Sequence, residues 1–145
     1  ADLLGGLPGE DLSSVLNSLN ELCICEPDAV QMGLLKILPD TPMLTIAQER
    51  GYIWQDTPPY QVLATDALSF DDICLLDDYA HILSLYWNKE EYKDVWHKAL
   101  QKVTATEAVQ HLKDIHTKGN LALHSVSKGK RELVMQEFCR DYHLN

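Results

Sequence analysis

The chain has 145 residues, 46% of them hydrophobic, with 22 acidic against 12 basic side chains and a formal net charge of -10. Because so acidic a surface repels phosphate backbones, nucleic acid is excluded as an expected partner. No apolar run approaches the roughly 20 residues that span a bilayer and no signal-peptide layout opens the chain, so we expect a cytoplasmic protein without membrane association.

The first predicted element is a corner between a strand and a helix. Residues 4–11 read LGGLPGED, an apolar strand end and a Gly-Pro-Gly turn, followed by Glu10 and Asp11, which suit the first turn of a helix. Apolar residues recur at helical spacing over residues 12–23, and a second strand-like run covers residues 29–38. The pattern predicts most of one βαβ repeat, so we expect the chain to be a piece of a larger α/β fold.

The middle of the chain predicts a short helix and an extended connector. Residues 42–50 read as a helix that starts after Asp40 or Thr41 and ends at Gly51. Residues 52–65 carry two adjacent prolines at their centre, which a continuous helix does not accept, so this segment should be extended.

The remainder of the chain predicts helices in series. Ser69 is a good N-cap with Asp72 three residues later, and the helix that follows has an apolar stripe broad enough to contact more than one neighbour. Leu83 and Trp87 lie on this stripe and should be buried. Shorter periodic patterns indicate three further helices, which start at about residue 89, near Thr106 and after a basic turn at residues 128–130. In the last helix, the residues expected to face inward are Leu133, Val134, Phe138, Cys139 and Tyr142.

These patterns together predict a mainly α protein in three segments. Residues 1–43 form a terminal strand-helix-strand portion, residues 44–68 a connector, and residues 69–145 a helical accessory domain.

Polar side chains show no catalytic or metal-binding pattern. The histidines, His111 and His116 among them, lack the spacing of a zinc protease and are expected to be solvated. The four cysteines, Cys23, Cys25, Cys74 and Cys139, do not suggest a disulfide framework and are expected to be free thiols. We therefore assign no catalytic residue and no metal ligand to this chain.

Several of the segments resemble one known family. Residues 4–11 resemble the I-x-G-L-P-G-E stretch late in the barrel of radical S-adenosylmethionine (SAM) enzymes, and residues 34–43 resemble the next barrel strand and its G-T-P ending. Residues 58–65, 68–73 and 86–88 resemble the C-terminal extension of the cobalamin (B12)-binding-domain subgroup. Asp40 stands where the family has glycine, so we expect that turn to be built differently, with Asp40 capping the following helix.

The resemblance implies a βαβ remnant of a radical SAM (TIM-like) barrel in front of the helical domain. In the intact protein it implies an Fe-S oxidoreductase that cleaves SAM at a 4Fe-4S cluster, with cobalamin as a further cofactor. The cluster-binding C-x-x-x-C-x-x-C is absent here, so the chain alone is expected to hold no cluster and to be inactive.

Three residues are candidates for cofactor binding in the intact protein. The resemblance implies that Gly6 and Leu7 line the adenosyl part of SAM, and the alternative is an ordinary turn between strand and helix. Lys36 is placed near the carboxyl end of the second strand, where barrel enzymes react, and the alternative is a lysine that extends into solvent.

Residues 1–40 are expected to need a partner, because two strands and one helix leave open sheet edges. In the intact protein this partner is the remainder of its own barrel. In the chain alone we expect a homodimer formed through residues 1–40, and a folded helical monomer once these residues are deleted. The competing function is a non-catalytic helical protein-interaction module.

Overall fold

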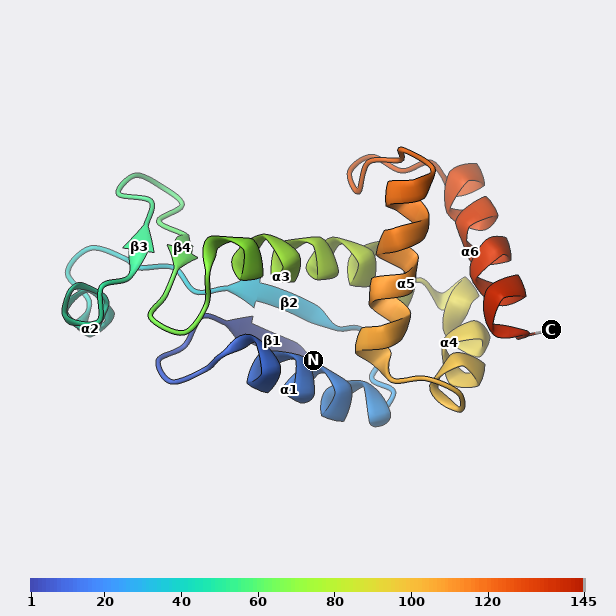
Figure 1. The fold of residues 1–145 in the computed structure, drawn as a ribbon, viewed down its shortest axis with the longest axis horizontal. Helices are drawn as coiled ribbons and strands as arrows, with labels where there is room; N and C mark the ends of the chain where they lie inside the picture. The colour runs from blue at the N-terminus through green and yellow to red at the C-terminus, as the bar shows by residue number, and fades with distance from the viewer. Residues whose placement is uncertain (145) are drawn as a thin grey trace.

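Helices make up more than half of the chain in the computed structural model, which describes residues 1–144. The molecule is elongated, with the strands and α2 towards one end and α4, α5 and α6 at the other (Figure 1). The elements are β1 (Asp2–Gly5), α1 (Leu12–Ile24), β2 (Gln31–Leu34), α2 (Pro42–Glu49), β3 (Ile53–Trp54), β4 (Val62–Ala64), α3 (Phe70–Ile82), α4 (Lys93–Leu100), α5 (Ala105–Lys118) and α6 (Lys128–Tyr142). The prediction of a mainly α fold is confirmed.

The first three elements form the predicted strand-helix-strand unit. β1 and β2 are parallel, with Asp2 opposite Gln31 and Gly5 opposite Leu34. Asp11 is the N-cap of α1, where its side chain accepts from the Ser14 amide at 2.8 Å. The expectation that Glu10 and Asp11 lie in the first helical turn is therefore wrong. Asp11 instead lies just before the helix, where its carboxylate accepts from a backbone N–H group of the first turn.

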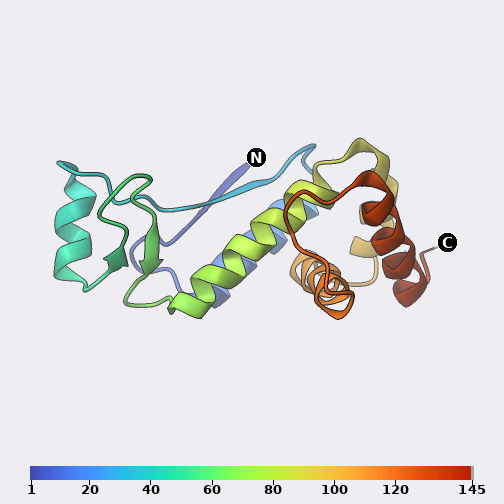
Figure 2. The ribbon, with the colours of Figure 1, turned by 90° about the horizontal axis from the view of Figure 1, so that it is seen from above.

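Helices cover one face of this two-stranded sheet. α1 contacts β1, α3 contacts β2, and both helices lie on the same side of the strands (Figure 2). Met32 is 7% exposed and belongs to the core, whereas Leu4 is 39% exposed and Asp2 and Gln31 are exposed. The strands therefore alternate between a covered face and an open one.

Residues 52–65 do not form a helix, as predicted, and the two ends of this segment pair with each other. β3 and β4 form a short antiparallel pair, in which Ile53 lies opposite Ala64. The Val62 N–H donates to the Leu35 carbonyl at 2.9 Å, and the Ile37 N–H donates to the Tyr60 carbonyl at 2.7 Å. The Leu35 N–H donates to the Gly5 carbonyl, the last contact of this segment with β1. Residues 60–62 therefore pair with residues 35–37, the continuation of β2 beyond the end of β1.

The turn before α2 departs from one expectation. Asp40 has a φ of 60°, in the left-handed region that favours glycine, and Thr41 is the N-cap of the helix. Aspartate tolerates this conformation better than most residues. Asp40 therefore does not cap α2, and the capping role expected for it is wrong.

α3 begins as its sequence suggests and continues through Trp87 in a π-helical turn that the sequence did not predict. The Ser69 hydroxyl accepts from the Asp72 amide at 3.1 Å, and the Asp72 carboxylate accepts from the Ser69 amide at 3.0 Å. This confirms the predicted capping box. The helix continues as a π-helical turn over Leu83–Trp87, which places Leu83 (0% exposed) and Trp87 (4% exposed) in the core.

α5 starts near Thr106, as predicted, whereas α6 starts earlier than predicted. α5 has Thr104 as its N-cap, and α6 has Ser127, so Lys128 to Lys130 form the first turn of α6 and no separate basic turn precedes it. The inward face of α6 consists of Val134, Met135 and Phe138. Leu133 is 65% exposed, which contradicts the prediction that it faces inward.

The buried side chains form one hydrophobic cluster along the whole molecule. It extends from Val15 in α1 to Leu144 and includes residues from all three segments predicted from the sequence. α1 also contacts α5, and the Asn20 side chain accepts from the Thr106 amide at 2.8 Å. Residues 1–40 therefore supply part of the core of the helical part, which does not support the expectation that the helices fold without them.

Candidate functional site

The corner after β1 contains two of the three candidate cofactor-binding residues. Gly6 is buried and has a φ of 104°, a conformation that other residues rarely adopt. A Cβ atom at this position would lie 3.2 Å from Val62 Cγ1 and 3.3 Å from Leu35 Cβ. Glycine is thus required here by the close approach of the chain's own residues, and the neighbouring Leu7 is 40% exposed.

Lys36, the third candidate, lies just beyond the carboxyl end of β2. Its side chain is exposed, and its backbone lies opposite Gln61 in an antiparallel bridge. Gly6 and Lys36 therefore lie at the same end of the parallel pair, as the strand pattern predicts. The role of Gly6, Leu7 and Lys36 in cofactor binding stays a prediction.

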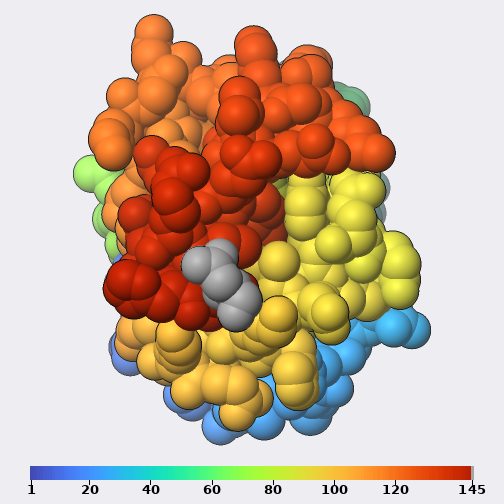
Figure 3. Space-filling model, turned by 90° about the vertical axis from the view of Figure 1, so that its right-hand side faces the viewer, coloured from blue at the N-terminus to red at the C-terminus, as the bar shows by residue number. Residues whose placement is uncertain are grey.

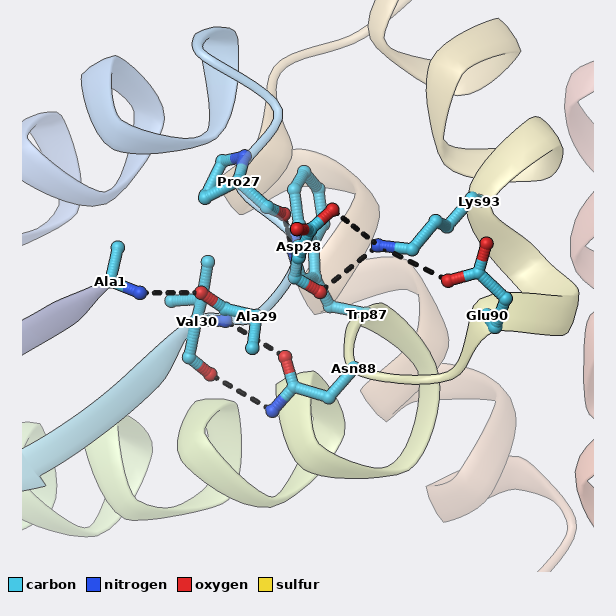
Figure 4. A network of polar contacts seen from close by, with 9 residues as sticks. All are labelled: Ala1, Pro27, Asp28, Ala29, Val30, Trp87, Asn88, Glu90 and Lys93. Carbon is cyan, nitrogen blue, oxygen red and sulfur yellow. Dashed lines mark hydrogen bonds and ion pairs between the residues drawn. The ribbon is translucent and has the colours of Figure 1, made fainter.

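A network of polar contacts lies at the opposite end of β2, where the helical part meets the strand (Figure 4). The Val30 amide donates to Asn88 Oδ1 at 2.8 Å, and Asn88 Nδ2 donates to the Val30 carbonyl at 3.1 Å. The side chain of Asn88 thus makes the two hydrogen bonds that a neighbouring strand would make with this residue. Trp87 Nε1 donates to the Pro27 carbonyl at 3.0 Å and fixes the preceding loop.

Lys93 completes the network from α4. Its Nζ donates to the Asp28 carbonyl at 3.0 Å and lies 3.6 Å from the Asp28 carboxylate and 3.9 Å from that of Glu90. Because the two carboxylates are exposed, these ion pairs contribute little to stability. Their effect is to hold the loop before β2 against α4. No local pattern in the sequence indicates this contact.

The buried polar group of the helical part is His116, which is 1% exposed. Its Nδ1 lies 3.2 Å from the Ala122 carbonyl, which can only accept, so Nδ1 carries the proton. Nε2 therefore accepts from the Tyr86 hydroxyl, 2.6 Å away. Burial lowers the pKa of His116 and raises that of Tyr86. The prediction of a solvated side chain is wrong for His116, since Tyr86 comes to it from the π-helical turn.

Acid is expected to destabilise the protein through His116. Because the pKa of folded His116 lies below its ordinary value of 6.5, the unfolded chain binds the proton first as the pH falls. The free energy of unfolding should then fall below pH 6.5 by up to about 1.4 kcal/mol per pH unit, until the folded state is protonated as well. His116→Gln keeps an acceptor for Tyr86 and does not titrate. The urea midpoints of the parent protein and His116→Gln, measured between pH 5 and 7.5, should converge as the pH falls. Midpoints that change in parallel with pH would refute this role of His116.

The cysteines do not converge on a common site. Cys23 is buried in α1, and burial raises its pKa to about 12. Cys25 and Cys74 are exposed, and Cys139 on α6 is half-buried. Within residues 1–144, no three histidine, cysteine, aspartate or glutamate side chains lie together as metal ligands would. In the same range, no helix combines the length and apolar character that a membrane crossing requires.

Comparison with known proteins gives one match. The model of a family described as "Protein of unknown function (DUF4080)" matches residues 48–139, which is more than half of the chain. No curated protein and no solved structure matches the sequence. The matched region includes the β3–β4 pair, the His116–Tyr86 contact and Asn88, and it excludes β1, α1 and β2.

Proposed function

The chain belongs to the DUF4080 family of proteins of unknown function, and we propose that it is the C-terminal part of a radical SAM enzyme of the cobalamin-binding-domain subgroup, an Fe-S oxidoreductase. The observation that carries the proposal is the β1–α1–β2 unit. Its strands are parallel, and its glycine corner lies at their carboxyl end, where barrel enzymes build their active sites. The motif of residues 4–11 spans the glycine corner of this unit, and the motif of residues 34–43 begins at the last residue of β2.

The exposed surface of the unit supports the remainder of a barrel as its partner. Strands of a closed barrel are paired along both edges and covered by helices on the outside only. β1 and β2 each have one strand partner, and both helices that cover them lie on one face. Leu4 and Leu7 at the strand ends of this unit are exposed apolar side chains, as is Leu38 just beyond β2. The homodimer through residues 1–40 is the alternative way to cover this surface and stays a prediction.

Within the intact enzyme, the chain would contribute to SAM binding and not to the cluster. Three thiolates must converge to bind a 4Fe-4S cluster. In this chain Cys23 and Cys25 lie at the end of α1, whereas Cys74 is on α3 and Cys139 on α6. The cluster, when bound elsewhere in the protein, supplies the electron that cleaves SAM. Leu7 and the backbone of the Gly6 corner would contact the adenosyl group, while Val62 and Leu35 close the space behind the glycine.

The test compares the protein encoded by the complete gene with the 145-residue chain. The complete protein, purified and reconstituted without oxygen, should form 5'-deoxyadenosine from SAM and a reductant, and its sequence should contain C-x-x-x-C-x-x-C ahead of Leu4. The 145-residue chain should show no stoichiometric cluster in its visible absorbance. A complete protein that lacks the motif and SAM cleavage would contradict the proposal, as would a cluster bound by the chain alone.

The contribution of Leu7 can be tested in the complete protein. Leu7→Glu places a charge on an exposed side chain and should leave folding intact while it raises the SAM concentration needed for half-maximal cleavage. Ile24→Glu is the matched control, because Ile24 is 73% exposed at the end of α1. Equal effects of the two variants would remove Leu7 from the SAM site.

A further inference from the structure

A surface groove of the helical part lies between α5 and α6. It has a volume of about 570 Å³, and its apolar floor includes Ile115, Leu121, Leu133 and Val134. Leu133 is 65% exposed, although it lies one residue from the buried Val134. Along α6 the groove extends from Lys130 to Arg140, which corresponds to about 15 Å at the helical rise. This is the length of about three helical turns.

The groove has a basic rim. Lys118, Lys130 and Arg140 line it, together with the acidic Glu137, whose carboxylate lies 3.6 Å from Lys118 Nζ. Lys130 and Arg140 therefore give the rim its net positive charge. The positive charge is unusual for this protein: residues 1–92 contain 16 acidic and 3 basic side chains, and residues 93–145 contain 6 acidic and 9 basic ones. Figure 3 shows the end of the molecule where these later residues gather, with α6 in red against α4 in yellow. The groove is therefore a basic site on an acidic protein.

We propose that the α5–α6 groove binds an amphipathic helix of a partner protein, with acidic residues beside its apolar stripe. An apolar floor takes such a stripe, and Lys130 and Arg140 attract the flanking carboxylates. The groove is concave and matches a convex helix, whereas an anionic membrane presents a flat surface. A nucleic acid would meet the repulsion of the remaining acidic surface. A radical SAM enzyme and an interaction module can both bind such a helix.

The test uses the 145-residue chain and two synthetic helical peptides. Both peptides are fluorescein-labelled and carry leucines spaced alternately three and four residues apart. The positions that flank the leucines are glutamate in one peptide and lysine in the other. Fluorescence anisotropy should show the glutamate peptide binding at least about tenfold more tightly than the lysine peptide, a difference that added salt reduces. Equal binding of the two peptides, or binding of neither, would overturn the proposal.

Two variants locate the binding. Leu133→Glu and Lys130→Glu change exposed side chains of the groove and should each weaken binding of the glutamate peptide by about tenfold or more. Lys98→Glu makes the same charge change on an exposed residue of α4 outside the groove and should change the affinity by less than about threefold. Equal losses in Lys98→Glu and Lys130→Glu would refute the groove as the site. The proposal would also be refuted if the protein sedimented with phosphatidylserine vesicles, lost this property in Leu133→Glu and did not bind the peptide. That result would assign the groove to a membrane.

Discussion

Deletion of residues 1–40 is expected to unfold the rest of the chain. The deletion removes the apolar core side chains of Val15, Leu19, Val30, Met32 and Ile37, none more than 7% exposed. Burying a side chain of this kind stabilises a protein by about 1.5–3 kcal/mol, so the five together are comparable to the whole stability of a domain, about 5–15 kcal/mol. Residues 41–145 should lose near-ultraviolet circular dichroism and cooperative urea unfolding.

Addition of a peptide of residues 1–40 provides the control for this experiment. If the deleted segment acts through the shared core, the peptide should restore part of the near-ultraviolet signal. A deletion variant that unfolds cooperatively with an unchanged midpoint would show that the helices form an independent core, as the sequence patterns alone suggested.

Leu83→Ala is expected to lower the free energy of unfolding by about 2–5 kcal/mol. Leu83 is 0% exposed and begins the π-helical turn after α3, so its removal leaves a cavity between elements that cannot easily move together. α3 contacts both β2 and α5, and this fixes the position of the turn from two sides. Urea denaturation followed by tryptophan fluorescence measures the change.

Leu133→Ala is the matched control, since Leu133 is also a helical leucine but is 65% exposed. Its substitution should change the free energy of unfolding by no more than about 0.5 kcal/mol. Similar losses in the two variants would mean that burial at Leu83 does not determine the stability of this region.

Elements with strong local signals could be predicted from the sequence. The capping box of Ser69 and Asp72 depends on residues three apart, and it has the predicted geometry. The parallel pairing of β1 and β2 followed from the Gly-rich corner and the apolar runs on either side of α1. The capping box depends on groups that are close in the chain, and the strand pairing depends on a strand-helix-strand pattern in which each element has its own local signal.

Features that depend on distant residues could not be predicted in this way. His116 is buried because Tyr86, 30 residues away, donates to it, and no local pattern indicates that contact. Leu133 and Val134 are adjacent and both apolar, and only the position of α6 against the core decides which one is buried. The sequence motifs predict a candidate site at the carboxyl end of the strands. The hydrogen bonds of Asn88 lie at the other end, and no periodic pattern of residues indicates them.

The hydrogen bonds of Asn88 with Val30 determine the register of β2 relative to the helical part. In a strand, neighbouring residues direct their N–H and C=O groups to opposite edges, so a slip of one residue would turn these groups of Ala29 or Gln31 away from the Asn88 amide. The same slip would move every side chain of the strand to the other face. Residue 36 lies six positions further along the chain, about 20 Å at the rise of a strand. An amide in the helical part thus sets which residues reach the carboxyl end of β2, and Asn88→Ala would remove that constraint without touching the candidate site.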